Sequence, residues 1–330
     1  MNEVPVIYAP IYMDHRAEGY HPENPERVKR VLDAIRPKVV VEPLPVRKED
    51  TFLVHDPDYV DLVEKESRLG YSHLDADTYV NDRTFEAALY ALGGALTAYE
   101  VQGFALTRPP GHHSGVAGKA LGGPTLGFCI FNNVAFPIRK LGLKRVAIID
   151  FDVHHGNGTQ EIFWNDPEVL HIDVHQDPRT LYPGTGFPED VGGKGAEGTK
   201  VNFVLPPGSG DDAYLELLPI IESILDDFRP EVIAFSAGFD AFEGDGLARI
   251  RATESTFYAF GKLARKAKRF YAVLEGGYSV GLSRGARAFY EALSGVEVEY
   301  KINQSPSALM TAIRDLTAYE RSILRNYWKV

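Results

Sequence analysis

Cysteine is almost absent from this chain, which has only Cys129 among its 330 residues. A lone cysteine excludes an intrachain disulfide and any metal site built from several thiolates. Cys129 lies in the apolar stretch 127–131, a setting more typical of a buried structural thiol than of a nucleophile. We therefore expect this thiol to be structural.

Long hydrophobic runs and excess positive charge are also missing. No apolar run approaches the roughly 20 residues that a membrane-spanning helix needs, and residues 1–5 lack signal-peptide character. The 35 Lys and Arg are outnumbered by 46 Asp and Glu, for a formal net charge of −11. This balance argues against direct nucleic-acid binding as a main function and is compatible with a cationic ligand such as a lysine side chain or a polyamine. We expect a cytoplasmic protein without a membrane partner. The sequence leaves its oligomeric state open, a homo-oligomer included.

Apolar runs alternate with amphipathic segments along the whole chain, a pattern that predicts a parallel sheet covered by helices on both faces. The apolar runs predict strands at residues 4–8, 103–107, 146–149, 169–175, 232–236 and 270–274. Apolar residues three and four apart predict helices at residues 25–35, 84–99, 213–228 and 253–267. We expect a doubly wound, three-layer α/β fold. No linker divides residues 1–330, so we expect one domain, with 296–330 as a helical extension packed on it.

Residues capable of metal binding follow the apolar run 146–149. If the strand continues, Asp150, Asp152 and His154 alternate in the same direction and point to one face. Carboxylates crowded on a buried strand would repel each other and lose hydration, and a bound cation removes that cost. The alternative is that one Asp caps the next helix and His154 merely packs. An Asp and a His form a normal partial ligand set for zinc.

Asp240 is the best candidate for a third ligand, because catalytic zinc sites use three protein ligands and leave a position for water. It ends an otherwise apolar strand, and the preceding Gly238 allows close approach of the backbone. In the alternative, Asp240 starts a turn before residues 243–246. An Asp/His/Asp set can hold either Zn²⁺ or Fe²⁺, so the metal is left open.

Tandem histidines, His112 and His113, follow a Pro-Pro-Gly turn at the end of another predicted strand. Adjacent histidines in a loop are commonly just polar loop residues. Here an imidazole supplies the base with a near-neutral pKa that activation of water requires. Such a base needs an orienting partner, and Asp150 and Asn157 could each hold one of the histidines.

Further strand ends carry polar groups. Tyr278 follows two glycines, and its hydroxyl could donate to a carbonyl oxygen, although a tyrosine at a strand end is more often simply packed. His171, Asp173 and His175 repeat the period-two pattern on a neighbouring strand. They could form a second ion site with Asp150, but we expect the two histidines to be satisfied by hydrogen bonds in the core.

Taken in order, several blocks of this chain resemble the histone deacetylase superfamily, which includes acetoin-utilisation proteins and acetylpolyamine amidohydrolases. The matching blocks are residues 21–27, 54–57, 108–113, 127–129, 150–160, 182–186, 236–240 and 275–278, and the resemblance extends to about residue 295. It implies the arginase/deacetylase-like fold and removal of an acetyl or short acyl group from an acetylated primary amine, such as acetyl-lysine or an acetylpolyamine.

The resemblance also implies roles for individual residues. Zinc would be held by Asp152, His154 and Asp240. His113 would be the general base and later the acid, His112 its electrostatic helper, and Tyr278 the group that polarises the acetyl carbonyl. Gly127, Phe128 and Tyr182 look like walls of an acetyl-lysine tunnel, and Asp77 resembles a rim aspartate that binds the substrate backbone. The family's inner potassium site is matched by Asp150, Asp173 and Val174, with backbone carbonyls near His154.

Two departures from the family pattern bear on substrate and pH dependence. Phe242 and the pair Asp245-Gly246 stand where many relatives have His and Pro, so the pocket shape should differ there. Asn157 stands where some relatives have Asp, which changes how strongly a protonated His113 is held.

Two other functions remain as alternatives. An arginase-like binuclear manganese ureohydrolase needs a carboxylate two residues after Asp240, where this chain has Phe242. A non-catalytic module that binds acetylated ligands would usually lack a ligand, the base or the tyrosine, all of which are present here.

Overall fold

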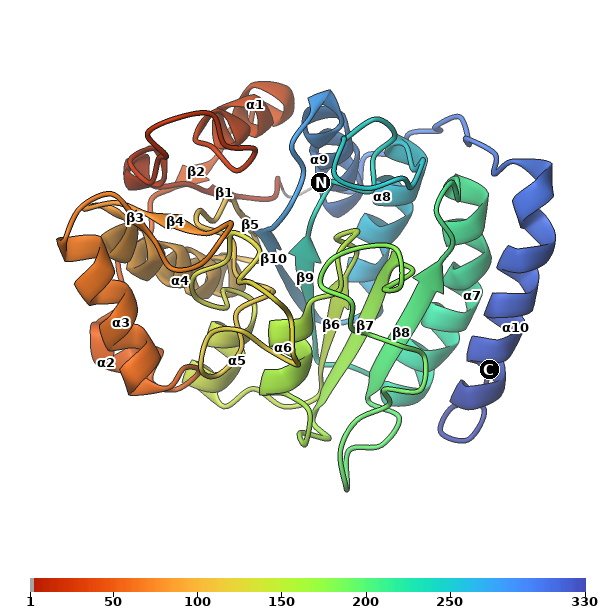
Figure 1. Ribbon diagram of the computed structural model, residues 1–330. Helices are drawn as coiled ribbons and strands as arrows, with labels where there is room; N and C mark the ends of the chain where they lie inside the picture. The colour runs from red at the N-terminus through yellow and green to blue at the C-terminus, as the bar shows by residue number, and fades with distance from the viewer. Residues whose placement is uncertain (1–2) are drawn as a thin grey trace.

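Eight parallel strands form the main sheet of the computed structural model, which describes residues 3–330 (Figure 1). Their order across the sheet is β2-β1-β5-β10-β9-β6-β7-β8. They comprise β1 (Val6–Ile7), β2 (Val40–Val41), β5 (Phe104–Ala105), β6 (Val146–Asp150), β7 (Val169–Gln176), β8 (Lys200–Leu205), β9 (Val232–Ala237) and β10 (Arg269–Leu274). Two short strands, β3 (Ser72–His73) and β4 (Tyr79–Val80), form a separate antiparallel pair. The predicted mainly parallel α/β fold is confirmed.

Helices cover both faces of this sheet. They are α1 (Glu26–Ile35), α2 (Lys48–Thr51), α3 (Pro57–Arg68), α4 (Thr84–Val101), α5 (Ala135–Leu141), α6 (Asn157–Ile162), α7 (Asp211–Phe228), α8 (Glu254–Lys262), α9 (Val280–Leu293) and α10 (Met310–Leu324). Short 3₁₀ turns are η1 (Pro10–Met13), η2 (Leu263–Lys266) and η3 (Ser307–Leu309). None of the helices described is long and apolar enough to cross a membrane.

Alternation along the central strands divides the buried residues into two large clusters. On β6, Ala147 and Ile149 belong to the cluster that also contains buried residues of α7, α8 and α9. Val146 and Ile148 belong to the other, with residues of α3, α4 and α5. Each face of the sheet is therefore covered by its own layer of helices. The loops that follow the parallel strands all lie at the same edge of the sheet.

The strand and helix predictions differ from the structure mainly at the edges. β2 and β8 have no counterpart among the predicted strands, and β1 and β5 are shorter than expected. The predicted helix 253–267 changes from α-helix to the 3₁₀ turn η2 at Leu263. Residues 296–306 are not helical, so the helical character expected for 296–330 begins only at η3 and α10.

Strand β8 lies at one edge of the sheet, and helix α10 packs against it. Glu320 of α10 is buried, and its Oε1 accepts the backbone N–H of Val204 at 2.6 Å. The Glu320 carboxyl group thus accepts from a backbone donor that an edge strand would otherwise leave unpaired.

Candidate active site

The polar residues predicted at the strand ends meet at one edge of the sheet, as expected for parallel strands. One part of the expectation was wrong. Strand β6 ends at Asp150, so Asp152 and His154 lie in the turn before α6 and are not aligned by strand alternation. Instead, the N–H of Asp152 donates to Asp150 Oδ1 at 3.1 Å, and the N–H of His154 donates to Asp152 Oδ1 at 2.9 Å. These two hydrogen bonds, from backbone N–H groups to aspartate side chains, define the shape of the turn.

Asp152, His154 and Asp240 form a buried cluster, with one potential ligand atom from each residue lying within 4.8 Å of the others. The Nδ1 atom of His154 is 2.9 Å from Asp240 Oδ2 and 3.2 Å from Asp152 Oδ1. Backbone N–H groups hold the outer oxygens: Gly276 donates to Asp152 at 2.8 Å and Val153 to Asp240 at 2.9 Å. Two carboxylates and an imidazole at this spacing fit a divalent cation of the zinc or ferrous type.

Two glycines make this cluster possible. A Cβ atom on Gly238 would lie 2.0 Å from Asp152 Oδ2, and one on Gly276 would lie 2.3 Å from Asp240 Oδ2. Side chains at either position would therefore displace the candidate ligands. The close approach of the backbone expected at Gly238 is confirmed. At Gly276 the backbone approaches the candidate ligands almost as closely.

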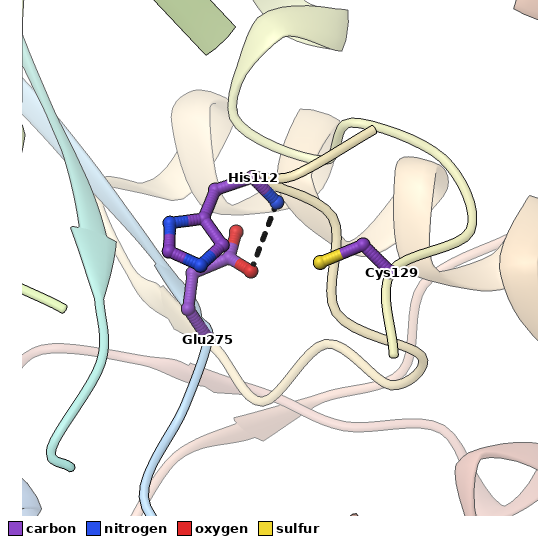
Figure 2. A group of neighbouring side chains, drawn as sticks. All are labelled: His112, Cys129 and Glu275. Atoms are coloured by element: carbon purple, nitrogen blue, oxygen red, sulfur yellow. Dashed lines mark hydrogen bonds between the residues drawn. The ribbon is translucent and has the colours of Figure 1, made fainter. Parts of the chain in front are cut away.

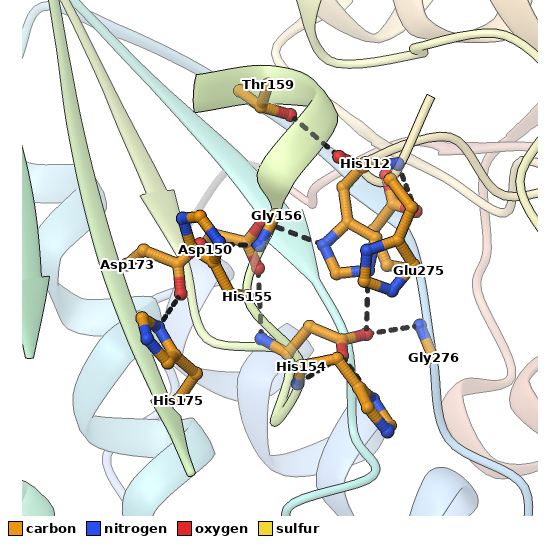
Figure 3. A network of polar contacts seen from close by, with 12 residues as sticks. His112, Asp150, His154, His155, Gly156, Thr159, Asp173, His175, Glu275 and Gly276 are labelled. Atoms are coloured by element: carbon orange, nitrogen blue, oxygen red, sulfur yellow. Dashed lines mark hydrogen bonds and ion pairs between the residues drawn. The ribbon is translucent and has the colours of Figure 1, made fainter. Parts of the chain in front are cut away.

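The tandem histidines each face a polar side chain of the segment that runs from the last residue of β6 to the first residue of α6. Figure 3 shows His112 beside Asp150. His112 Nδ1 is 2.9 Å from Asp150 Oδ2, and His113 Nδ1 is 2.8 Å from Asn157 Oδ1. The centroids of the two imidazole rings are 4.0 Å apart, and His112 Nε2 lies 3.7 Å from Asp152 Oδ2. One histidine therefore pairs with a carboxylate and the other with a neutral amide.

This difference in partners separates the pKa values of the two imidazoles. Burial lowers the pKa of His112, but the charges of Asp150 and Asp152 outweigh burial and raise that pKa well above its usual range. Burial and the neighbouring His112 lower the pKa of His113 well below its usual range. In the protein without bound metal, His112 is therefore the member that more readily carries charge, and His113 is the member that more readily stays neutral and can accept a proton.

The sequence did not indicate a role for Glu275, which follows β10 directly and lies beside His112 (Figure 2). Its Oε2 accepts the N–H groups of Gly111 at 2.9 Å and His112 at 3.2 Å, while Oε1 has no partner among residues 3–330. Burial raises the pKa of this carboxyl. Cys129 lies beside it, fully buried as predicted, and its sulfur accepts the N–H of His113 at 3.4 Å.

Tyr278 is partly buried, and its hydroxyl has no hydrogen-bond partner among the described residues. Asp245 accepts its backbone N–H at 2.8 Å, and the guanidinium of Arg27 lies 4.8 Å from the centre of its ring. Burial raises the pKa of the phenol well above its usual range, against the opposing effect of Arg27. The hydroxyl is therefore a protonated donor that is free to bond a ligand.

A buried ion network behind Tyr278 was not predicted. Arg27 donates from Nε to the carbonyl of Gly277 at 2.7 Å and pairs with Glu23 at 3.1 Å. Arg108 forms a two-point contact with the same Glu23 and also bonds Tyr79. Glu23, Arg27 and Arg108 are all fully buried. They join α1 and the segment after β5 to the loop that carries Tyr278.

Four residues resemble substrate-binding positions, namely Gly127, Phe128, Tyr182 and Asp77. The first three lie beside His113 or Tyr278. The Tyr182 ring packs edge-on against His113 with centroids 4.9 Å apart, and a Cβ on Gly127 would lie 2.6 Å from His113 Cδ2. Phe128 packs edge-on against Tyr278 at 5.7 Å. Asp77 is half-buried, and its two oxygens accept the hydroxyls of Thr78 and Thr125 at 2.8 and 2.5 Å. Its carboxylate is thus already hydrogen-bonded.

Asp150, His171 and Asp173 form a second buried cluster beneath the first. The core hydrogen bonds expected for the histidines are present for His175, which bonds Asp173 at 2.6 Å and the carbonyl of Gly186 at 2.7 Å. For His171 the expectation was wrong, because neither ring nitrogen has a hydrogen-bond partner among residues 3–330, and its Nε2 lies 3.6 Å from Asp173.

The chain matches the family model described as the histone deacetylase domain over residues 21–293. It belongs to the histone deacetylase family. An uncharacterized protein of Methanocaldococcus jannaschii is 46% identical over 299 residues, 87% of this chain and 86% of that protein. A probable deacetylase of Methanothermobacter thermautotrophicus is 41% identical over 310 residues, 89% of this chain and 92% of that protein. The crystal structure of the HDA15 HD domain has a TM-score of 0.86 at 31% identity, covering 99% of this chain and 95% of that one.

These comparisons confirm the family resemblance and the fold that it implies. The matched range contains the three candidate metal ligands, both tandem histidines and Tyr278. The histone deacetylase family includes metal-dependent hydrolases, and the buried ligand clusters are compatible with that chemistry.

Proposed function

We propose that this protein is a metal-dependent amidohydrolase that removes an acetyl or short acyl group from an acetylated primary amine. The observation that carries the proposal is the convergence of an Asp152/His154/Asp240 cluster with a pair of histidines of opposite pKa shift. Membership in a family with probable deacetylases supports the reaction class. Zinc is the proposed metal, with ferrous iron as the alternative.

The residues divide the work of amide hydrolysis. A divalent cation held by Asp152, His154 and Asp240 would polarise the amide carbonyl and lower the pKa of the attacking water. His113 accepts the proton of that water and later returns it to the departing amine. The Tyr278 hydroxyl donates to the carbonyl oxygen as negative charge develops on it.

The remaining polar groups orient these residues. Asp150 holds His112 in its charged form, and Asn157 aims His113. We also propose that Asp150, Asp173 and the backbone at Val174 bind a structural potassium ion. The support for this site is the register that places Asp150 opposite Asp173 and the buried cluster in which oxygens of both side chains lie close together. Gly127, Phe128 and Tyr182 are proposed to line the acyl-amine channel, and Asp77 is proposed to contribute at its rim.

A binuclear ureohydrolase is less consistent with the site. Phe242, two residues after Asp240, is buried and stacks on Phe257 with ring centroids 6.0 Å apart. An apolar ring therefore stands where a second metal would need a carboxylate.

The test is turnover by the metal-loaded protein on acetyl-lysine peptides and acetylated polyamines, with metal content measured alongside. Hydrolysis that disappears in Asp240→Ala, but persists in the exposed-residue control Glu222→Gln, supports the proposal. Two metal equivalents per chain with hydrolysis of guanidino substrates would support the ureohydrolase. Stoichiometric binding of acetyl-lysine peptides without any hydrolysis would support a binding module.

A further inference from the structure

A pocket of about 540 Å³ is lined by residues that lie close in sequence to groups of the candidate active site. Gly184 and Thr185 line it, and they follow Tyr182, whose ring packs against His113. Thr185 Oγ1 lies 2.8 Å from Nδ1 of His155, the neighbour of the candidate ligand His154. Because a residue spans at most about 3.6 Å, Gly184 lies within about 7 Å of Tyr182 along the chain. A ligand of peptide length can therefore reach both places.

The lining of this pocket combines aromatic rings with uncompensated negative charge. Trp164 and Phe187 contribute the rings, and Glu161 and Asp190 contribute carboxylates. No Lys or Arg lines the pocket, and neither carboxylate forms an ion pair within residues 3–330. Aromatic faces beside carboxylates attract organic cations, so this lining is suited to an ammonium or guanidinium group.

Backbone hydrogen bonds hold both carboxylates in place. Glu161 accepts the N–H groups of Val116 at 3.0 Å and Leu121 at 3.2 Å. Asp190 accepts the N–H of Phe187 at 2.9 Å. Hydrogen bonds to the backbone therefore fix the positions of both carboxylates in the lining of the pocket.

Gln160 adds a hydrogen-bond donor to the pocket. It lines the pocket although it is only 1% exposed. Its Oε1 is engaged by His155 at 3.1 Å and Asn202 at 2.9 Å, while its amide nitrogen has no partner among the residues described. This nitrogen is available to donate to an acceptor such as a carbonyl oxygen of a ligand. A protonated acetylpolyamine offers no acceptor beyond its acetyl group, whereas a peptide offers one at every residue.

We infer that this pocket binds a lysine or arginine side chain near the acetylated lysine of a peptide substrate, while Gln160 donates to a peptide carbonyl. The inference rests on the proposed deacetylase function and narrows its substrate class from acetylated amines in general to basic peptides. Trp164 and Asp190 then determine specificity by contacting the flanking cation.

The kinetic test compares two acetyl-lysine peptides that differ only by arginine or its neutral isostere citrulline beside the acetyl-lysine. The arginine peptide should have a kcat/KM roughly tenfold higher, mainly through a lower KM. Trp164→Leu and Asp190→Asn should reduce this ratio to less than about twofold, because each removes one part of the cation site. Glu222→Gln, which removes an exposed carboxylate on α7, should leave the ratio intact.

Three outcomes would overturn the inference. The first is the absence of an arginine advantage. The second is an advantage that persists in Trp164→Leu and Asp190→Asn. The third is an acetylated diamine whose turnover depends on Trp164 and Asp190 as strongly as that of the arginine peptide, because the pocket would then select the cation alone.

A binding measurement separates this inference from the proposed function. The chain has two tryptophans, so Trp328→Phe leaves Trp164 as the sole indole. Titration with the unacetylated arginine peptide should give a saturable fluorescence change that Asp190→Asn weakens. If Trp328→Phe does not fold, the difference between wild type and Trp164→Leu provides the same signal. Saturable binding without hydrolysis of any peptide would refute the proposed deacetylase activity but would still support binding of a basic peptide in the pocket. Hydrolysis without arginine preference or fluorescence change would refute only the pocket.

Discussion

Glu275 accepts the backbone N–H of His112, linking the end of strand β10 to the tandem histidines across 163 residues of sequence. The contact holds the backbone of His112, while Asp150 holds its ring. Burial raises the pKa of Glu275 and so weakens the preference of this carboxyl for its charged form. Glutamine removes the charge but keeps an oxygen that can accept the same N–H groups.

Replacing Glu275 should therefore separate loss of the side chain from loss of its charge. Glu275→Ala leaves two buried N–H groups unpaired and should lower the free energy of unfolding by about 1–3 kcal/mol for each lost bond. It should also reduce kcat more than it raises KM. Glu275→Gln should retain most stability and turnover. Urea unfolding and steady-state kinetics provide the measurements, and equal losses in both variants would show that the charge matters.

Removing the Tyr278 hydroxyl tests its proposed contact with the carbonyl oxygen. Tyr278→Phe should lower kcat by about 10²–10³-fold, the range found when one donor to a developing oxyanion is lost. Metal content and the melting temperature should stay close to wild type, because the hydroxyl has no partner among the described residues. Near-normal turnover would exclude Tyr278 from the mechanism.

The amide at position 157 should set the acid limb of the pH profile. Asn157→Asp places a carboxylate at the oxygen that lies 2.8 Å from His113 Nδ1, and an opposite charge at that distance raises an imidazole pKa. Since His113 must be neutral to act as the base, the acid limb of kcat/KM should move to higher pH. A profile over pH 5–9 measures the shift. An unchanged acid limb would assign it to another group.

Metal affinity should depend on the proton of His154. Burial lowers the pKa of His154, but Asp240 and Asp152 outweigh burial and raise that pKa to about 10 in the protein without bound metal. Ligation needs the neutral imidazole, so Zn²⁺ affinity should rise by about tenfold per pH unit as pH increases from 6.5 to 8.5. Competition with a chromophoric chelator measures this slope. The exposed-histidine variant His73→Gln should show the same slope, and an affinity independent of pH would contradict the assignment.

The burial of Lys200 should make the free energy of unfolding increase with pH in the alkaline range. Burial lowers the pKa of this ammonium from 10.5 to about 7. Between those values the unfolded chain binds more protons than the folded one, so stability from this residue rises with pH. The gain is up to about 1.4 kcal/mol per pH unit. Below about pH 7 both states are protonated and the contribution is constant.

Comparison with Lys200→Met isolates this effect. The free energy of unfolding of wild type relative to Lys200→Met should increase as pH rises from 7 to 10, measured by urea unfolding at each pH. Lys194→Met, at an exposed position, is the matched control. Parallel pH curves for wild type and Lys200→Met would show that the ammonium is not desolvated in the folded protein.

The contacts that sequence could predict are those between residues at the ends of apolar strands. His112 with Asp150 and His113 with Asn157 were expected, because parallel strands bring their carboxyl ends to one edge. The network of Glu23, Arg27 and Arg108 was not expected. Its members lie in an N-terminal helix region and a loop, and nothing local marks them as partners until the fold joins them. Strand β8 was missed for a related reason, since its first residue is a lysine that tertiary structure buries.

The contact of Glu320 with Val204 has a consequence for the edge of the main sheet. Helix α10 occupies the side of β8 on which another polypeptide could otherwise add as a ninth strand. Deleting α10 would uncover a six-residue strand with buried, β-branched and aromatic residues. Such a strand is a template for intermolecular pairing, so a protein shortened before Met310 should self-associate through β8 even where its catalytic groups are unchanged.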